Sequence, residues 1–427
     1  MSKREPNITP PAVDQIKLRQ DDNITKQVRK YKLITPLFGG GVEPGVNDEM
    51  TPISGKAIRG HLRFWWRATR GGQFDGSLEK MKEIEDLIWG AASTKDKPRP
   101  SLVQIEVESL INNGGRIGSP ITLPRAYSYV TFPLDDKPSK EVRDDIEFLL
   151  TIKFRQDKRI EVEAALWAWE TFGGTGARTR RGFGALKLIE LKENDEARSV
   201  DRPATVNEVR KWIDAKLKDF SVKGKWHDEV PHLAIKPSPV WLKITKKNSP
   251  SPAEIWKYLI GKLKEFRQAR FNKEAFLEGE GKVKNDYGIS RWPEANEIRR
   301  RLNTPAKIID DSTPSKFPRA NFGLPINFHL AHDKDEPTVI LQGQNSQRRA
   351  SPLILKLLTC LDEKTVGLAL LIEPVSLPPG DLKLEGVPEG RAIVTRDLTE
   401  LTISEALQIE PLHNERHVLQ AFLSTIQ

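Results

Sequence analysis

A glycine- and arginine-rich stretch at residues 173–186 restricts the possible folds of this chain more than any other part of the sequence. It holds five glycines and three arginines in fourteen residues, with no acidic residue among them. Glycines at this density permit positive φ angles and let the backbone approach another group closely. Apolar residues recur at helical spacing in residues 160–171, and residues 185–191 have the composition of a strand. We therefore expect a loop that connects a helix to a strand.

The order of these elements excludes two common phosphate-binding loops. A Walker loop and a dinucleotide-binding turn both run from a strand to a helix, and the first also requires Gly-Lys-Ser/Thr. The functional interpretation that remains is a turn whose N–H groups and arginine side chains bind an anion. The alternative is a solvated glycine turn without a ligand. The loop residues that we expect to contact phosphate are Gly174, Gly176, Arg178, Arg180, Arg181 and Gly182.

A second glycine turn and an arginine-rich helix lie near the N-terminus. Residues 25–34 alternate as a strand, and a run of three glycines follows its end. Ser54 is a suitable N-cap for a helix that extends to Arg70. The second set of expected phosphate contacts is Gly39, Gly40, Gly41, Lys56, Arg59, Arg63 and Arg67.

The arginines of this helix form a stripe beside an apolar face. Four of them recur at helical spacing from Arg59 to Arg70, so they point to one side. Like charges at this spacing repel each other by roughly a few tenths of a kcal/mol per pair, and a bound anion would offset that cost. We therefore expect RNA or an acidic protein subunit against the stripe, with a solvated arginine face as the alternative.

Composition narrows the kind of partner and the kind of chemistry. Lys and Arg outnumber Asp and Glu by 68 to 59, which favours a polyanionic partner such as nucleic acid. The single cysteine, Cys360, excludes an intramolecular disulfide and a cysteine zinc site. Histidines are few and dispersed and carboxylates do not cluster, so the sequence predicts no catalytic residues, no metal site and no cofactor. No apolar run reaches membrane-spanning length and no signal-like segment follows Met1, so we expect a cytoplasmic protein without a membrane partner.

The predicted elements indicate an α+β fold with two related units. Residues 25–191, with one helix set aside, follow a βαββαβ order that is typical of ferredoxin-like or RRM-type domains. Residues 232–427 contain strands and helices that fit a second, divergent ferredoxin-like domain with a helical insertion. Residues 1–24 are expected to form a flexible arm, and residues 192–231 a connection between the two domains.

The predicted fold also brings the two basic elements together. In a ferredoxin-like unit the loop before the last strand can reach the start of the first helix. We therefore expect Arg59 and Arg63 to share one surface with the arginines of the loop at residues 173–186.

These motifs resemble the RAMP superfamily of CRISPR proteins. Residues 176–184 are similar to its C-terminal glycine-rich loop. Residues 34–41 and 53–67 are similar to one branch in particular, the large Cmr subunit (the first in Cmr numbering) of the type III-B RNA-targeting effector. Shorter resemblances to that branch follow at residues 322–326 and 348–353.

The resemblance implies a role in antiviral defence. It implies two ferredoxin-like domains, crRNA and target RNA as ligands, and other Cmr subunits as protein partners. Members of this branch lie at the end of the effector distal to the crRNA 5′ tag and help to engage target RNA along the guide, while another subunit cuts the RNA. The leading interpretation is therefore a non-catalytic RNA-binding subunit of a type III-B Cmr effector, whose phosphate contacts fix register without reading sequence.

Single side chains allow one alternative function. Some RAMP proteins cleave CRISPR transcripts with a histidine and no metal ion, and His61 is the only histidine in the basic region. Its place on the predicted helix is away from the arginine stripe, and no second acid or base accompanies it. A metal-independent endoribonuclease is the second interpretation. Phe64, Trp66 and Tyr127 are candidates for stacking on a base, with packing in the core as the alternative.

Overall fold

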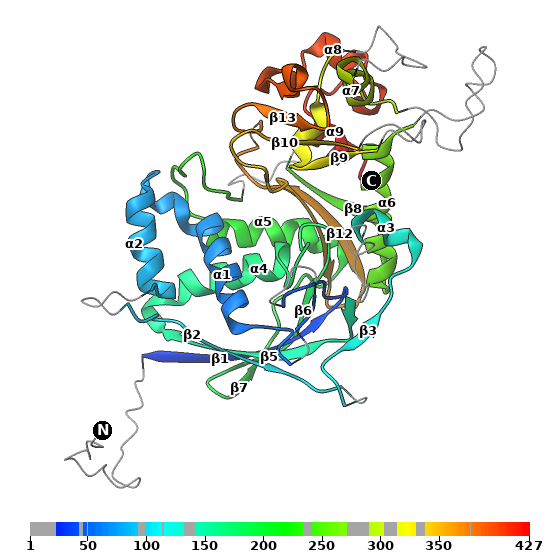
Figure 1. Ribbon diagram of the computed structural model, residues 1–427. Helices are drawn as coiled ribbons and strands as arrows, with labels where there is room; N and C mark the ends of the chain where they lie inside the picture. Colours follow the sequence, from blue (N-terminus) through cyan, green and yellow to red (C-terminus); the bar gives the residue numbers. More distant parts are fainter. Residues whose placement is uncertain are drawn as a thin grey trace, which may run out of the picture.

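The computed structural model describes residues 23–41, 46–48, 50–92, 99–112, 115–131, 142–233, 241–270, 290–302, 314–329, 338–375 and 377–427. The arm predicted at residues 1–24 lies outside the described residues except for its last two positions. A larger part built from two sheets and their helices carries a smaller lobe at one end (Figure 1). In the described part of the chain, no helix is both long enough and apolar enough to cross a membrane.

The first unit is a five-stranded antiparallel sheet with two helices on one face. Its elements in chain order are β1 (Ile24–Leu33), α1 (Gly55–Arg70), β2 (Gln104–Ser109), β5 (Glu147–Arg155), α4 (Arg159–Phe172), β6 (Leu186–Glu193) and β7 (Glu196–Arg198). The strands follow the order β2-β5-β1-β6-β7, and α1 and α4 lie side by side above the sheet (Figure 1). The helix and the strand predicted on either side of the glycine-rich loop are α4 and β6, which confirms the predicted path of the chain there.

Several elements are added to this unit. They are α2 (Leu78–Trp89), β3 (Ser119–Ile121), α3 (Ser128–Thr131), β4 (Val142–Asp144) and α5 (Val209–Phe220). Helix α2 packs beside α1, and β3 pairs with β4. Helix α5 lies in the region predicted as a connection, and Ile213 and Leu217 are buried in the same core as the first sheet.

A second antiparallel sheet packs against the helices of the first unit. Its strands are β8 (Leu242–Ser249), β11 (Leu353–Thr359) and β12 (Thr365–Leu371), in the order β11-β12-β8, and α6 (Pro252–Gln268) packs on it. Ile354 and Leu358 of β11 belong to the same apolar core as Trp169 of α4. The two units are therefore joined by shared apolar packing rather than by a solvated connection.

The C-terminal lobe contains a separate four-stranded sheet. Its elements are α7 (Glu294–Leu302), β9 (Ile326–Phe328), β10 (Val339–Gly343), β13 (Leu382–Glu385), β14 (Ile393–Val394) and α8 (Ile403–Leu407), with the strand order β14-β13-β10-β9. The runs at residues 324–328 and 338–342 indicate strands of the second ferredoxin-like unit, which was expected over residues 232–427. They belong to this additional sheet instead. Their side chains, with Phe317 and Leu341 among the buried residues, form an apolar cluster that is separate from the other cores.

The sequence of residues 411–426 predicts one amphipathic helix at the end of the chain. The last helix in the structure, α9 (Val418–Ser424), is shorter. His413 and Asn414 adopt positive φ angles of 47° and 69°, which interrupt the helical path before α9 begins. Phe422 of α9 packs with Phe266 of α6.

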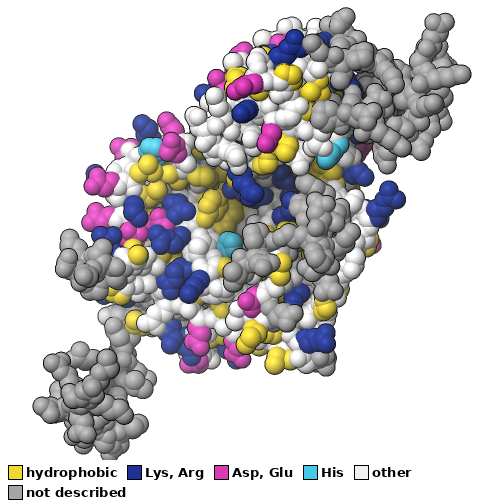
Figure 2. Space-filling model, in the orientation of Figure 1, with side chains coloured by type: hydrophobic (Ala, Val, Ile, Leu, Met, Phe, Trp, Pro, Cys, Tyr) yellow, Lys and Arg dark blue, Asp and Glu magenta, His cyan; other side chains and the backbone are white. Residues whose placement is uncertain are grey.

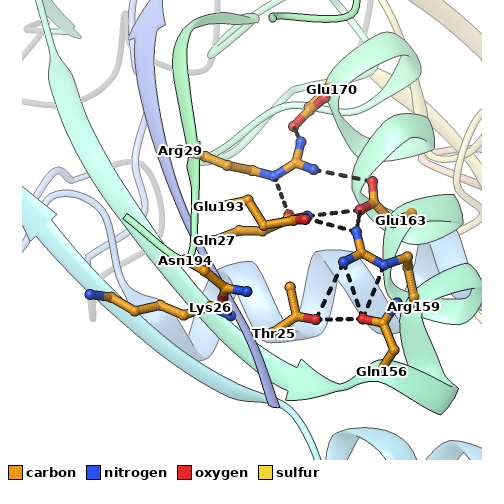
Figure 3. A network of polar contacts seen from close by, with 10 residues as sticks. All are labelled: Thr25, Lys26, Gln27, Arg29, Gln156, Arg159, Glu163, Glu170, Glu193 and Asn194. Atoms are coloured by element: carbon orange, nitrogen blue, oxygen red, sulfur yellow. Dashed lines mark hydrogen bonds and ion pairs between the residues drawn. The ribbon is translucent and has the colours of Figure 1, made fainter. Parts of the chain in front are cut away.

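A polar network ties α4 to the first sheet (Figure 3). Gln27 and Arg29 occupy buried positions on the inner face of β1. The Arg29 guanidinium contacts the carboxylates of Glu163 at 3.3 Å and Glu170 at 2.9 Å, both on α4. Burial raises the pKa of Glu170, and the Arg29 charge opposes that rise. The network fixes the end of α4, from which the glycine-rich loop departs.

Candidate nucleic-acid interface

The two glycine turns lie against each other. We define the glycine-turn junction as residues 35–41 together with residues 173–184. The Ala177 N–H donates to the Phe38 carbonyl at 2.7 Å. A methyl group placed on Gly40 would lie 3.8 Å from the Cα of Gly176. Two motifs that are far apart in the sequence therefore form one surface element.

Most glycines of the junction are required by packing inside the protein. Gly182 has a φ of +86°, and a Cβ there would lie 2.7 Å from the indole nitrogen of Trp256. Gly176 has a φ of +78°, and its Cβ would lie 2.5 Å from Leu37 Cδ1. Of the glycines expected to contact phosphate, Gly39, Gly174 and Gly182 are buried, Gly41 and Gly176 are half-buried, and Gly40 is exposed. The close approach that the glycines allow is made mainly to the protein itself, so the three buried glycines cannot touch a phosphate in this arrangement.

The arginines of the loop bond to backbone carbonyls. Arg180 Nη1 donates to the Ser351 carbonyl, and Arg181 Nη1 donates to the Leu353 carbonyl at 3.3 Å. Both carbonyls belong to the chain entering or within β11. No carboxylate of the described residues pairs with Arg180 or Arg181. Hydrogen bonds to carbonyls satisfy N–H groups but leave the positive charge without a counter-charge.

The three arginines of the loop carry their positive charge in surroundings that disfavour it. Burial lowers the pKa of Arg178, Arg180 and Arg181, and the charge of Arg267 on α6 lowers that of Arg181 further. Guanidinium groups stay protonated at physiological pH, so these shifts express the cost of burying positive charge. A bound anion would reduce that cost.

The arginine stripe of α1 faces the protein instead of solvent. Arg63 donates to Glu85 at 2.6 Å and to Asp86 at 3.1 Å, and Arg67 donates to Glu85. Arg59 donates to two backbone carbonyls at 2.8 and 3.2 Å. Glu85 and Asp86 lie on α2 and are 4% and 6% exposed. The anion that offsets the repulsion within the stripe is thus a pair of carboxylates of the same chain, which corrects our expectation of RNA at this position.

The orientation of α2 differs from the one that its sequence indicates. The apolar spacing of residues 78–92 predicts that Leu87 points inward, yet Leu87 is 50% exposed. The helix turns Glu85 and Asp86 inward because the arginines of α1 require carboxylate partners where they are removed from water.

The structure also separates the stripe from the loop arginines. The Arg180 guanidinium lies 5.9 Å from the centroid of the Phe64 ring. Phe64 follows Arg63 directly and therefore points about 100° away from it around the helix. Arg63 is bonded to Glu85 and Asp86 on α2, whereas Arg180 is bonded to the Ser351 carbonyl, so the two arginines are held by different partners.

The first turn of α1 is a basic element next to the junction. Lys56 is exposed and pairs with no described residue. Ser54 makes no side-chain cap bond, and the first turn contains no acidic residue. A Cβ on Gly40 would lie 3.7 Å from the carbonyl oxygen of Pro52, so the chain just before α1 adjoins the junction. A helix N-terminus of this kind favours an anion.

Only one of the three aromatic candidates for base stacking reaches the surface. Trp66 is fully buried and its indole N–H donates to Glu161 at 2.6 Å. Tyr127 is buried and its hydroxyl donates to the Ala253 carbonyl at 3.0 Å. Phe64 is half-buried, with Arg180 beside its ring.

His61 has no orienting partner in the described part of the chain. It is half-buried on α1, and burial lowers the pKa of its imidazole. Its ring makes no hydrogen bond with another described residue, and the described residues contain no group of three or more His, Cys, Asp or Glu arranged to hold a metal ion.

The outer face of the first sheet differs from a base-stacking platform. On β1 it presents Lys26, Lys30 and Lys32, each in an ion pair with a carboxylate. Their neighbours Leu149 and Thr151 on β5 are not aromatic. RNA-binding sheets hold bases by stacking on aromatic side chains, so this face is not favoured as the RNA site.

The distribution of charge over one face of the molecule agrees with a basic centre. Figure 2 shows Lys and Arg side chains in the hollowed middle of this face, while Asp and Glu lie mainly towards its edges. Such an arrangement attracts a polyanion towards the middle.

Comparison with known proteins identifies the family. A sequence model of the RAMP superfamily matches residues 30–187. The CRISPR system Cmr subunit Cmr1-2 of Pyrococcus furiosus is 32% identical, over a region that covers 38% of this chain and 93% of that protein. The chain belongs to the RAMP superfamily, among the Cmr subunits of the Cmr1 type. The CRISPR system Cmr subunit Cmr1-1 of the same organism is 24% identical, over 33% of this chain and 42% of that protein.

One solved structure of a Cmr complex contains a chain with this fold. A chain in the cryo-EM structure of the type III-B Cmr-beta bound to cognate target RNA matches with a TM-score of 0.50 and 12% identity, over 95% of this chain and all of that chain. The crystal structure of Cmr1 from Pyrococcus furiosus in its apo form matches with a TM-score of 0.47 and 15% identity, over 87% of this chain and 94% of that chain. At 12% identity the likeness to the Cmr-beta chain concerns the fold alone.

The RAMP glycine-rich loop has partners that sequence reasoning missed. The Leu355 N–H donates to the Arg180 carbonyl at 3.1 Å, and the Trp256 indole N–H donates to the Arg181 carbonyl at 2.8 Å. Lys356 donates from a fully buried position to the Gly173 carbonyl at 2.5 Å. A signal for Lys356 was present, because it interrupts the apolar run at residues 353–358.

Proposed function

We propose that this Cmr1-type subunit is a non-catalytic RNA-binding subunit of a type III-B CRISPR effector. The observation that carries the proposal is the charge of the glycine-turn junction. Arg180 and Arg181 are half-buried and donate to backbone carbonyls, and no described carboxylate compensates them. An RNA phosphate is the counter-charge that suits such a site.

The proposed contact surface combines the junction with the first turn of α1. Its members are Gly40, Gly41, Lys56, Gly176, Arg178 and Arg180. Phosphates can approach the exposed Gly40 and Lys56 directly. The loop arginines are half-buried and add positive charge beneath this surface. Phe64 beside Arg180 is the one candidate for contact with a base.

The remaining basic residues take other roles in this proposal. Arg59, Arg63 and Arg67 hold α2 against α1, whereas Arg181 holds the loop on β11 and adds its charge to the proposed site. These contacts stabilise the scaffold that presents the surface.

The partners follow from the family. We propose that the RNA is crRNA, target RNA or the duplex between them, and that other Cmr subunits complete the effector in antiviral defence inside the cell. We further propose two ferredoxin-like units, residues 25–191 and 232–427, linked through 192–231, with residues 1–24 as an N-terminal arm. The strand order β2-β5-β1-β6 supports the first unit, and the sequence of elements β8-α6-β11-β12 supports the second. The Cmr-beta complex that contains a chain of similar fold is bound to cognate target RNA, which supports an RNA ligand.

We leave the endoribonuclease interpretation out of the proposal. A general base is usually oriented by a hydrogen-bonded partner, and the described residues supply none for His61.

Binding of single-stranded RNA by the purified full-length chain tests the proposal. Lys56→Gln and Arg180→Gln should each weaken binding and reduce the salt dependence by about one unit of slope, because each removes one phosphate contact. Lys80→Gln is the matched control, since Lys80 is an exposed lysine on α2. The proposal fails if both variants bind RNA as tightly as the control and with the same salt dependence.

A further inference from the structure

Strand β11 contains a lysine, Lys356, on a buried face where its neighbours are apolar. Leu353 and Leu355 pack with residues of α6, whereas Ile354 and Leu358 lie in the core shared with the first unit. Lys356 is on the same side as Ile354 and Leu358 and is 0% exposed. Lysine is almost never fully buried unless it is paired, because loss of hydration is costly.

The buried amine meets the first residue of the glycine-rich loop. Lys356 Nζ donates to the Gly173 carbonyl at 2.5 Å. Gly173 follows directly after α4, so the amine lies at the C-terminal, negative end of that helix. Glu170, in the last turn of α4, is the charged group whose field acts on Lys356.

Glu170 belongs to the polar network of the first sheet, and Figure 3 shows its carboxylate bonded to Arg29. The carboxylate accepts hydrogen bonds from Arg29 at 2.9 Å and from the Tyr31 hydroxyl at 2.5 Å, both on β1. The last turn of α4 is thus bonded to β1 through Glu170, and the residue after α4 is bonded to β11 through the Gly173 carbonyl.

The far end of the loop is also attached to β11. The Leu355 N–H donates to the Arg180 carbonyl at 3.1 Å, and Arg180 Nη1 donates to the Ser351 carbonyl. The loop is therefore held at its start by a side chain of β11 and near its end by the backbone of the same strand.

We propose that Lys356 is a positioning residue that sets the conformation of the glycine-rich loop according to how the second sheet docks on the first unit. The loop arginines then take the orientation seen in this structure only when the second sheet is fully packed on the first unit. A methionine would suit the apolar surroundings better, so the lysine is retained for geometry rather than for stability. The expected effect of Lys356 on RNA binding rests on the proposed function, whereas its effect on the loop conformation does not.

The test compares Lys356→Met with Ile354→Met in the full-length chain. Both changes place a flexible apolar side chain on the same buried face of β11, and only the first removes the bond to Gly173. Hydrogen–deuterium exchange of residues 173–184 is measured without RNA, and RNA affinity is measured separately. Lys356→Met should accelerate exchange in the loop and weaken RNA binding by about tenfold each, as loss of a charge-assisted hydrogen bond predicts. Ile354→Met should do neither.

The inference is overturned if loop exchange in Lys356→Met equals that of the wild type, or if Ile354→Met changes it equally. If Lys356→Met does not fold, Lys356→Leu is judged by the same criterion, because it also removes the amine that donates to the Gly173 carbonyl. Failure of the wild type to bind RNA would refute the proposed function, while the exchange measurement would still decide the role of Lys356.

Discussion

Two arginine clusters of this chain look alike in sequence and are opposite in the structure. Those of α1 lie against α2, where Arg63 and Arg67 share the carboxylate of Glu85. Those of the glycine-rich loop lie against β11, where Arg180 and Arg181 meet carbonyl oxygens. A guanidinium paired with a buried carboxylate has its counter-charge, and one paired with carbonyls does not. For Arg63 and Arg67 on one side and Arg180 on the other, the presence of a counter-charge, and not the spacing, separates the scaffold from the proposed binding surface. Arg59 belongs to the scaffold for a different reason, because its carbonyl partners hold it against α2 and the chain that follows.

The largest effect should come from breaking the α1 cluster. Glu85→Ala leaves Arg63 and Arg67 without their shared partner. We expect the free energy of unfolding to fall by about 2 to 3 kcal/mol, less than for a fully buried pair because the arginines are partly exposed. Urea denaturation measures this, with Glu83→Ala, an exposed glutamate of the same helix, as the control. Equal stability of the two variants would show that the α1 cluster is not structural.

The second prediction compares one variant from each arginine cluster in both melting temperature and RNA affinity. Arg63→Gln should lower the melting temperature and leave the affinity for RNA at the wild-type value. Arg180→Gln should weaken RNA binding and change the melting temperature little, because a hydrogen bond is lost while repulsion among the loop arginines is relieved. Both quantities are measured on both variants. The distinction between the clusters collapses if Arg63→Gln weakens RNA binding without loss of stability.

The third prediction concerns pH and the docking of β11. Burial lowers the pKa of Lys356 from 10.5 to about 7, and the charge of Glu170 opposes that shift. Arg29 and Tyr31 of β1 are the groups bonded to Glu170 on its other side. Between these two pKa values the unfolded chain binds more protons at this residue than the folded chain, so its contribution to stability rises with pH.

We therefore expect the stability difference between wild type and Lys356→Met to shift in favour of the wild type from pH 7 to pH 10. Below pH 7 both states bind the proton and the difference should be constant. Urea denaturation over this range measures the difference. A difference that is flat or falls between pH 7 and pH 10 would mean that the amine stays charged in the folded protein.

The smallest effect is expected at His61. His61→Ala should leave target cleavage by a reconstituted effector unchanged, since the ring has no partner among the described residues. Cleavage and target binding are measured on the same preparation. Loss of cleavage with target binding intact would revive the nuclease interpretation.

Local patterns were sufficient for much of the first unit. Alternation over residues 25–34 predicted β1, and the helical spacing of residues 160–171 predicted α4 up to the glycine at its end. These periodicities follow from burial of one face of each element, which a single sequence records directly. Two strands of the C-terminal sheet, β9 and β10, lie in runs that the sequence indicates as strands, but β14 carries too few residues to show a period, and the pairing of these strands into a separate sheet has no local signal.

The candidate site likewise has features that the sequence indicates and features that depend on tertiary contacts. The sequence indicated that residues 35–41 form a tight glycine turn and that residues 173–184 form a tight, basic one, because glycine and arginine have the same conformational and charge properties in any fold. It could not indicate that Glu85 turns towards Arg63, or that Lys356 reaches Gly173 from the other unit.

By itself, then, the sequence determined where the helices and strands of the first unit lie, which turns need glycine, and where positive charge is abundant. Only the tertiary structure decided which arginines receive a carboxylate and which are left with carbonyl oxygens. The physical reason is that the energy of a charge depends on its distance to other charges and to water. Those distances are set by how α2 and β11 pack on the first unit, and no local pattern encodes them.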